Sequence, residues 1–315
     1  MTNAKEIKKR IKSISNIKKI TSAMEMVAAA KMRRAIEAVL KTRTYANLGW
    51  ATIINISESA SFGKIKHPLL EKRKEIKRVL LVLIASNRGL CGGFNSAVIN
   101  KAISSIKTHN NLPTDFIIIG KKAATIRNRF GYEIISEFIK NDVKPSVAEV
   151  APIAKTAIEQ FLEKKYDKVI LAYTDFVSPA KQVPRLRQLL PVEIDAEDKY
   201  LGATAKSEKL KTDYDFIKEK EKKHLGGSSH FFTYEPDDKE VLDSLLPRMI
   251  EVQLFQGLLE SNASEHSARM NSMHQASGAA GDLVDELTLF YNKARQSAIT
   301  AEIAEISSGA ASLSS

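Results

Sequence analysis

The C-terminal seventy residues carry the pattern that most restricts the fold of this chain. From Leu242 to Ala301, one series of residues recurs at alternating intervals of three and four residues. Every residue of this series is apolar except Gln256, His266 and Ser277. This alternation is typical of the contact seam of a coiled coil. We call these positions the seam: Leu242, Leu245, Met249, Val252, Gln256, Leu259, Ala263, His266, Met270, Met273, Ser277, Ala280, Val284, Leu287, Tyr291, Ala294, Ala298 and Ala301.

A helix of this length is on the order of 100 Å long at about 1.5 Å per residue, so it needs a long partner. Its middle is rich in small side chains, among them Ala263, Ser264 and Ser267 and the run at 276–281, which would let another helix approach closely. Pro247 is expected to kink the helix or to mark its true start.

The N-terminal residues, roughly 3–56, are the expected partner. They are rich in helix-forming residues, and isoleucines occur at 7, 11, 14, 17 and 20. Each of the three consecutive three-residue steps from Ile11 to Ile20 rotates this stripe by about −60°, so Ile11 and Ile20 point in opposite directions. One neighbouring helix cannot bury both, which predicts a larger bundle or several surrounding partners. Because the two long helices lie at the chain ends, we expect them to pair antiparallel.

The middle of the chain alternates strand-like and helix-like segments, and its βαβαβαβ order implies a mainly parallel sheet covered by helices. A further edge strand and an exposed, Lys- and Glu-rich insert at 195–229 follow. The expected strands lie at 78–86, 115–120, 132–139, 167–176 and 183–192, and the expected helices at 94–108, 121–131 and 147–165.

The composition limits the class of partner and the compartment. A formal charge of +11 would attract nucleic acid, acidic lipid or an acidic protein, but aromatic residues make up only 7% and are not interleaved with the basic clusters. Nucleic-acid binding is therefore not expected. The longest apolar run, 79–85, is far shorter than the roughly 18 residues that span a bilayer. A lone cysteine and the lack of a signal-peptide core fit a cytoplasmic protein.

The motif SNRGLCGGFNSA at 86–97 follows the first expected strand and opens a helix, which is where phosphate-binding loops lie. It lacks both the Lys-Ser/Thr ending of the P-loop and the G-x-G-x-x-G order, so a tight strand-to-helix turn is favoured over a nucleotide site. Cys91 is interpreted as a buried thiol rather than a nucleophile. His266 is interpreted as a register-setting polar residue rather than a metal ligand. The sequence therefore predicts no catalysis, no cofactor and no metal.

The segment 293–315 leaves two interpretations open. The last seam positions, Ala294, Ala298 and Ala301, are all alanine. Three residues next to them have long hydrogen-bond-donating side chains, Lys293, Arg295 and Gln296, and mostly small side chains follow. It is either a fraying helix terminus or a slim tip inserted into a partner that encloses it. In the second case Arg295 and Gln296 would hydrogen-bond acidic or carbonyl groups of the wall.

Three separated motifs together resemble the gamma-subunit family of bacterial F-type ATP synthases. They are KEIKKRIKSISNIKKITSAMEMVAAAKMRRA at 5–35, SNRGLCGGFN at 86–95 and YNKARQSAITAEIAEISSGAAS at 291–312. The resemblance covers essentially the whole chain except the insert. It implies an α/β plus long α fold: an antiparallel two-helix coiled coil, formed by residues 1–60 and 237–315, bearing a Rossmann-like domain at 75–235.

The function that this resemblance implies is that of a central-stalk rotor. One copy would couple ion flow through the membrane c-ring to ATP synthesis or hydrolysis at beta-subunit sites. The expected partners are the ring of alpha and beta subunits, the epsilon subunit and the c-ring. The chain would be non-catalytic, bind no nucleotide, and lie peripherally at the cytoplasmic face of the bacterial plasma membrane.

The resemblance also assigns residues to contacts. Arg295 and Gln296 look like the residues that hold a beta-subunit catch loop, with Thr300 and Met24 nearby. Ile303 and Ile306 would turn in the apolar bearing of the ring.

The foot of the rotor, including Tyr234 and Glu235, looks like the part that meets the epsilon subunit and the c-ring. The 195–229 insert lies where chloroplast members carry a redox segment, but here it has no cysteine, which excludes a thiol switch. We hypothesise that it acts as a brake, so its deletion should change ATP synthesis, hydrolysis or their ratio.

Two rival functions make different predictions. A nucleotide-dependent enzyme with a coiled-coil dimerisation arm would bind nucleotide near 89–95. A basic coiled-coil scaffold would bind nucleic acid with an affinity that falls steeply with salt.

Overall fold

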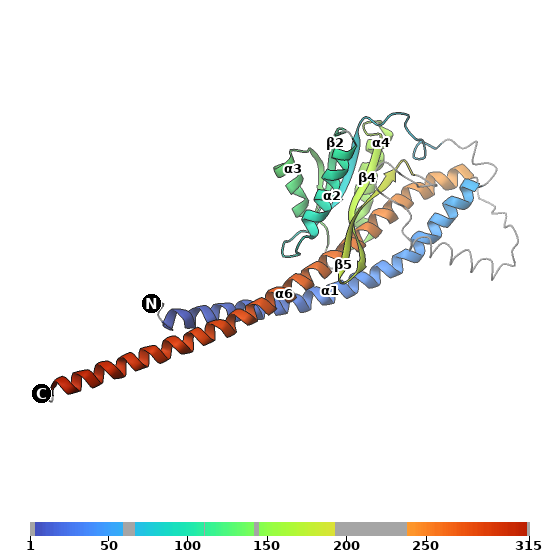
Figure 1. The fold of residues 1–315 in the computed structure, drawn as a ribbon. Helices are drawn as coiled ribbons and strands as arrows, with labels where there is room; N and C mark the ends of the chain where they lie inside the picture. Colours follow the sequence, from blue (N-terminus) through green and yellow to red (C-terminus); the bar gives the residue numbers. More distant parts are fainter. Residues whose placement is uncertain (1–3, 59–66, 110, 142–144, 193–237, 314–315) are drawn as a thin grey trace. The chain divides into compact units, whose positions relative to one another are not determined.

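A computed structural model describes residues 4–58, 67–109, 111–141, 145–192 and 238–313 (Figure 1). By its contacts the chain divides into two compact units, residues 1–29 with 269–315, and residues 30–268. The insert at 195–229, Tyr234 and Glu235 lie outside the described residues.

Two long helices belong to both units. Helix α1 spans Ala4–Glu58 and helix α6 spans Asp238–Leu313, which confirms the two predicted terminal helices. Pro247 lies inside α6, nine residues after its first residue, so it does not mark the start of the helix. A proline lacks the N–H that would bond to the carbonyl four residues earlier, and the helix continues through this position without that bond.

Residues 30–268 contain a five-stranded sheet in the order β3-β2-β1-β4-β5. Strands β1 (Val79–Ile84), β2 (Thr114–Ile119), β3 (Ile134–Phe138) and β4 (Lys168–Ser178) are parallel, as predicted. Strand β5 (Lys181–Leu190) runs antiparallel to β4 at the edge of the sheet, which confirms the expected edge strand.

The two faces of the sheet pack against different helices. Alternate residues of β1, such as Leu81 and Leu83, face α2 (Phe94–Thr108) and α3 (Thr125–Phe130). The residues between them, such as Leu80 and Val82, face α4 (Val147–Leu162) and the first part of α6. Burial on both faces explains why β1 is a continuous apolar run. The sheet is therefore covered by helices on both faces, which is the predicted Rossmann-like arrangement (Figure 1).

A close approach of two backbones fixes how β2 ends. Gly120 has a φ of 95°, and a Cβ atom there would lie 2.2 Å from the carbonyl oxygen of Ala85. Only glycine fits this position, since it has no side chain and tolerates positive φ. A short 3₁₀ turn, η2 (Lys121–Ala124), leads from Gly120 into α3.

The other unit is an antiparallel pair made of the start of α1 and the end of α6. His274 Nδ1 lies 2.9 Å from Glu25 Oε1, and the Lys18 ammonium lies over Gly281. The order along α1 is thus opposite to that along α6. Between 280 and 294, the seam positions are buried or half-buried, while Asp282, Asp285 and most of their neighbours are exposed. The predicted seam is confirmed over this stretch.

The predicted rotation of the isoleucine stripe is also confirmed. Ile7 is buried and Ile11 half-buried, whereas Ile17 and Ile20 are 49% and 59% exposed. The stripe therefore turns away from α6, as its three-residue steps require. Among the described residues, no helix is long and apolar enough to span a bilayer.

Candidate functional site

The carboxyl edge of the parallel sheet is where open α/β folds place their ligands. The turn between β1 and α2 lies at this edge and is closed by its own side chains. Asn95 Oδ1 accepts a hydrogen bond from the Ser86 backbone N–H at 2.9 Å, and Asn95 Nδ2 donates to Ser86 Oγ at 2.8 Å. Asn95 Nδ2 also lies 3.3 Å from Cys91 Sγ, whose residue is only 2% exposed. The interpretations of 86–97 as a tight turn and of Cys91 as a buried thiol are confirmed.

Helix α6 covers the same edge next to β4. Thr174 lies level with Ala85, just past the end of β1. Its backbone N–H donates to Ser261 Oγ at 3.1 Å, and its carbonyl accepts from Ser264 Oγ at 3.2 Å. Both main-chain groups of Thr174 therefore bond to α6, which lies against β4 at this edge.

A buried ion pair joins α6 to the segment that follows β3. The Lys140 ammonium bonds to Glu265 and also donates to Asn262 Oδ1 at 2.7 Å. The side chains of Lys140 and Glu265 are 0% and 1% exposed. Asn87, in the 86–97 turn, donates from Nδ2 to the Lys140 carbonyl at 2.7 Å. Charges buried to this degree are stable only when they are paired.

This ion pair was not predicted from the sequence. The one visible signal was a glutamate, Glu265, in a run of small residues directly beside the seam position His266. His266 is buried, but nothing in the structure tests a role in register. The small side chains of Ser264 and Ser267 were expected to admit a second helix. Ser264 Oγ instead bonds to the Thr174 carbonyl of β4, and Ser267 Oγ donates to the Pro179 carbonyl in the β4–β5 turn at 2.7 Å.

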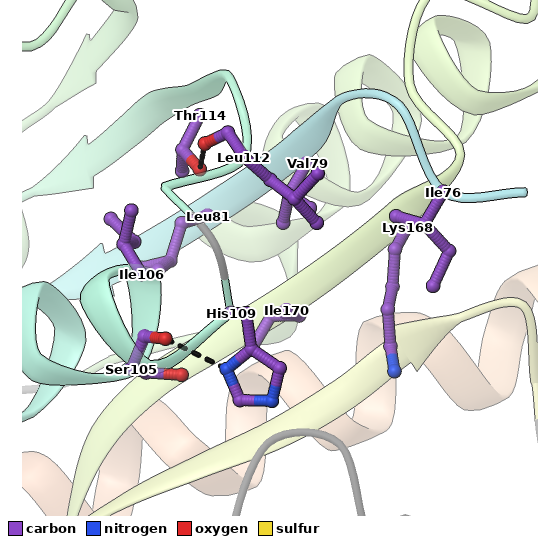
Figure 2. A pocket seen from close by; sticks show the side chains of 10 residues that line it. All are labelled: Ile76, Val79, Leu81, Ser105, Ile106, His109, Leu112, Thr114, Lys168 and Ile170. Atoms are coloured by element: carbon purple, nitrogen blue, oxygen red, sulfur yellow. Dashed lines mark hydrogen bonds between the residues drawn. The ribbon is translucent and has the colours of Figure 1, made fainter.

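A pocket lies at the opposite, amino-terminal edge of the sheet, where β1, β2 and β4 begin (Figure 2). His109 Nδ1 lies 2.7 Å from the Ser105 carbonyl, and Thr114 Oγ1 donates to the Leu112 carbonyl at 2.8 Å. These polar groups bond to the chain itself, so the pocket offers an apolar wall rather than the convergent donors that a phosphate requires. It is lined by Ile76, Val79, Leu81, Ser105, Ile106, His109, Leu112, Thr114, Lys168 and Ile170.

No catalytic or metal-binding group is evident in the part of the chain that the structure describes. His, Cys, Asp and Glu side chains form no group of three suited to a metal ion there. The pKa of Tyr173 is raised well above its usual range, first by burial and then by the nearby Glu260. Tyr173 lies against α6 at Gly257. The tyrosine is thus a neutral packing residue at neutral pH.

The predicted contact residues of the C-terminal helix are exposed in this chain. Arg295, Gln296 and Thr300 are all exposed, and Thr300 Oγ1 donates to the Gln296 carbonyl within the helix at 2.9 Å. Ile303 and Ile306 are 61% and 67% exposed. From Arg295 to Ser308 every side chain is exposed, so this end of the helix has no cover within the described chain.

Exposed apolar side chains also occur on α1. Met24 is half-buried, while its neighbours Met26 and Val27 are 65% and 56% exposed. Helical surfaces of this kind mark interaction sites when several large apolar residues lie together. The structure places Met24 and Arg295 on different helices of the same unit.

Comparisons with known proteins identify the family. A family model described as ATP synthase matches residues 3–313. The ATP synthase gamma chain of Herpetosiphon aurantiacus is 42% identical over 320 residues, covering 99% of each chain. That of Chloroflexus aurantiacus is 38% identical and that of Coxiella burnetii 37%, each over at least 99% of both chains.

Solved structures share the fold. The central stalk and c-ring of the Tetrahymena thermophila mitochondrial ATP synthase includes a chain with a TM-score of 0.58 at 23% identity, covering 82% of this chain and 99% of that one. A Euglena gracilis mitochondrial ATP synthase contains another with a TM-score of 0.62 at 17% identity, covering 98% and 94%. With identities near 40% over the full length of bacterial relatives, the chain belongs to the ATP synthase gamma-chain family.

Proposed function

We propose that this chain is the central-stalk rotor subunit of an F-type ATP synthase, and that it has no catalytic site of its own. The observation that carries the proposal is the full-length similarity to bacterial gamma chains. Its non-catalytic role is supported by α6, whose serines bond to the main chain of β4 at the edge of the sheet where open α/β folds place their ligands.

The rotor would act through unequal contacts with a three-fold ring of alpha and beta subunits. An asymmetric pair of helices meets each beta subunit differently in each orientation. A contact shifts a catalytic site between open and closed only by the difference in its free energy with those two states. Rotation driven by ion flow through the c-ring would present this difference to each site in turn.

Exposed residues of α6 and the half-buried Met24 of α1 would supply the contacts. Arg295 and Gln296, with Thr300 and Met24, would hold a catch loop of the beta subunit, because charged and amide donors bond strongly to carboxylates and carbonyls. Ile303 and Ile306 would turn within an apolar bearing formed by the ring.

The remaining contacts concern the membrane side. Tyr234 and Glu235, which lie outside the described residues, would contact the epsilon subunit and the c-ring. Through them the chain would be attached peripherally at the cytoplasmic face of the bacterial plasma membrane, as one copy per complex.

The test is to co-express this chain with the alpha and beta subunits of its own organism. We expect a complex with one copy per three alpha–beta pairs, whose ATPase activity falls by about tenfold or more in the Arg295→Ala, Gln296→Ala variant because a charged and an amide hydrogen bond are lost together. Arg129→Ala on the exposed side of α3 is the control and should leave the activity unchanged. The absence of a complex, together with stoichiometric nucleotide binding by the isolated chain, would favour the enzyme instead.

A further inference from the structure

One stretch of α6 is buried on every side. Each residue from Gly257 to Ser267 is buried, whereas α6 exposes Asp243 and Arg248 before this stretch and His274 after it. A helix buried all round is normally apolar. This one contains Glu260, Ser261, Asn262, Ser264, Glu265, His266 and Ser267.

The polar side chains of this stretch bond in two different directions. Ser261, Ser264 and Ser267 reach β4 and the turn that follows it. Gln182 of β5 adds a further bond, from its Nε2 to Ser267 Oγ at 3.2 Å. Asn262 and Glu265 instead reach Lys140, which follows β3. The helix is therefore bonded at two separate places, to β4 with its following turn and to the segment that follows β3.

Close packing adds to these bonds. A Cβ atom at Gly257 would lie 2.8 Å from Leu171 Cδ2, so the backbone of α6 lies directly against β4. Apolar burial alone would stabilise this contact, but it is non-directional and resists sliding weakly. Hydrogen bonds weaken steeply as their distance and angle change, so they oppose rotation of the helix against the sheet.

We propose that residues 257–267 of α6 form a torque joint, through which turning force passes between the sheet and the C-terminal helix. Lys140, Glu265 and Asn262 are its positioning residues, since they hold the helix at a fixed angle to the edge of the sheet. The inference rests on the proposed rotor function and identifies where within this chain the load is carried.

The experiment uses the whole ATP synthase in vesicles and compares ATP hydrolysis with ATP-driven acidification. The variant is Lys140→Met with Glu265→Leu, which removes both charges together and so leaves neither buried alone. The matched control is Lys155→Met with Glu159→Leu, an exposed Lys–Glu pair on α4. Thermal unfolding of each complex is measured alongside.

We expect the joint variant to assemble and to hydrolyse ATP within about twofold of the wild-type rate in detergent, where there is no load. Its ratio of acidification to hydrolysis should fall severalfold, because the joint slips when rotation works against an ion gradient. The α4 control should keep the wild-type hydrolysis rate and the wild-type ratio of acidification to hydrolysis. A purely structural role would change the thermal midpoint without changing this ratio.

A wild-type ratio in an assembled joint variant would overturn the proposal. If the double variant does not assemble, the Asn262→Ala variant is tested instead, because it keeps the ion pair and removes the hydrogen bonds of the Asn262 side chain to Lys140 and to the Asn141 carbonyl. A lowered ratio in Asn262→Ala supports the joint, and an unchanged ratio refutes it. If even the wild-type chain forms no complex with the alpha and beta subunits, the rotor function itself fails, which is a different result.

Discussion

At the scale of single residues, His67 shows how burial sets a protonation state. The Leu69 backbone N–H donates to His67 Nδ1 at 3.1 Å, so the ring proton lies on Nε2, which is 3.0 Å from Asp243 Oδ1. Burial lowers the pKa of His67 below its usual 6.5 and outweighs the raising effect of Asp243, while Lys239 lowers it further. The histidine is therefore neutral in the folded chain at neutral pH.

This assignment predicts the direction of a pH effect on stability. The unfolded chain binds a proton at His67 more readily than the folded chain does, so the contribution is fully present above pH 6.5 and is lost as the pH falls below it. Protonation would also remove the acceptor for the Leu69 N–H. We expect the thermal midpoint to drop between about pH 7 and pH 5.5.

The measurement compares the wild type with His67→Gln, which does not titrate, by thermal unfolding over the same pH range. The slope of the midpoint against pH should be shallower in the variant. Carboxylates and their ion pairs, such as Asp115 with Arg78 at 2.7 Å, are common to both proteins and cancel in the comparison. Parallel curves would show that His67 does not contribute.

At the scale of elements, α6 is one helix with two different environments. Two of its glycines, Gly257 and Gly278, have different surroundings. Gly257 lies against the fully buried Leu171 of β4, whereas nothing lies within 4 Å of a Cβ atom at Gly278. The same substitution should therefore have opposite effects at these two positions.

Alanine is favoured over glycine in a helix interior by about 1 kcal/mol. Gly278→Ala should accordingly raise the free energy of unfolding. Gly257→Ala should lower the free energy of unfolding by about 1–2 kcal/mol, because overpacking a buried contact exceeds the helical gain. Both are measured by chemical denaturation of the isolated chain, and stabilisation by Gly257→Ala would contradict the close approach to β4.

At the scale of the whole molecule, the C-terminal end of α6 is not covered by other described parts of the chain. Lys293 and Arg295 are exposed on a helix end with no buried side chain beyond Gly281 among its described residues. Such a segment opens locally at little cost in free energy. The isolated chain should therefore be cut by trypsin at these residues first.

Assembly with the alpha and beta subunits should slow this cleavage by about tenfold or more, because a bound helix opens rarely. The fragments are identified by mass spectrometry over a time course. A Lys293→Gln, Arg295→Gln variant should lose the product in both states, which verifies the site. Equal cleavage rates in the free and assembled chain would contradict insertion of the tip into an enclosing ring.

The sequence alone was sufficient for the elements and for the faces they bury. FNSAVINKAISSIKT was predicted as a helix and coincides with α2, because its apolar spacing and lack of breakers depend only on neighbouring residues. The seam of α6 and the rotating stripe of α1 are predictable for the same reason, since helical geometry converts spacing into direction. The function was predicted from the resemblance of three sequence motifs to those of a known family.

Only the tertiary structure decided which partner each side chain meets. Lys140 and Glu265 are 125 positions apart, and no local pattern brings them together. Their meeting depends on the angle at which α6 crosses the sheet, which results from packing of the whole core. For the same reason Ser264 and Ser267 of α6 were predicted to face a helix and instead bond to β4 and its turn. A periodic pattern shows which side of a helix is buried, but not what covers it.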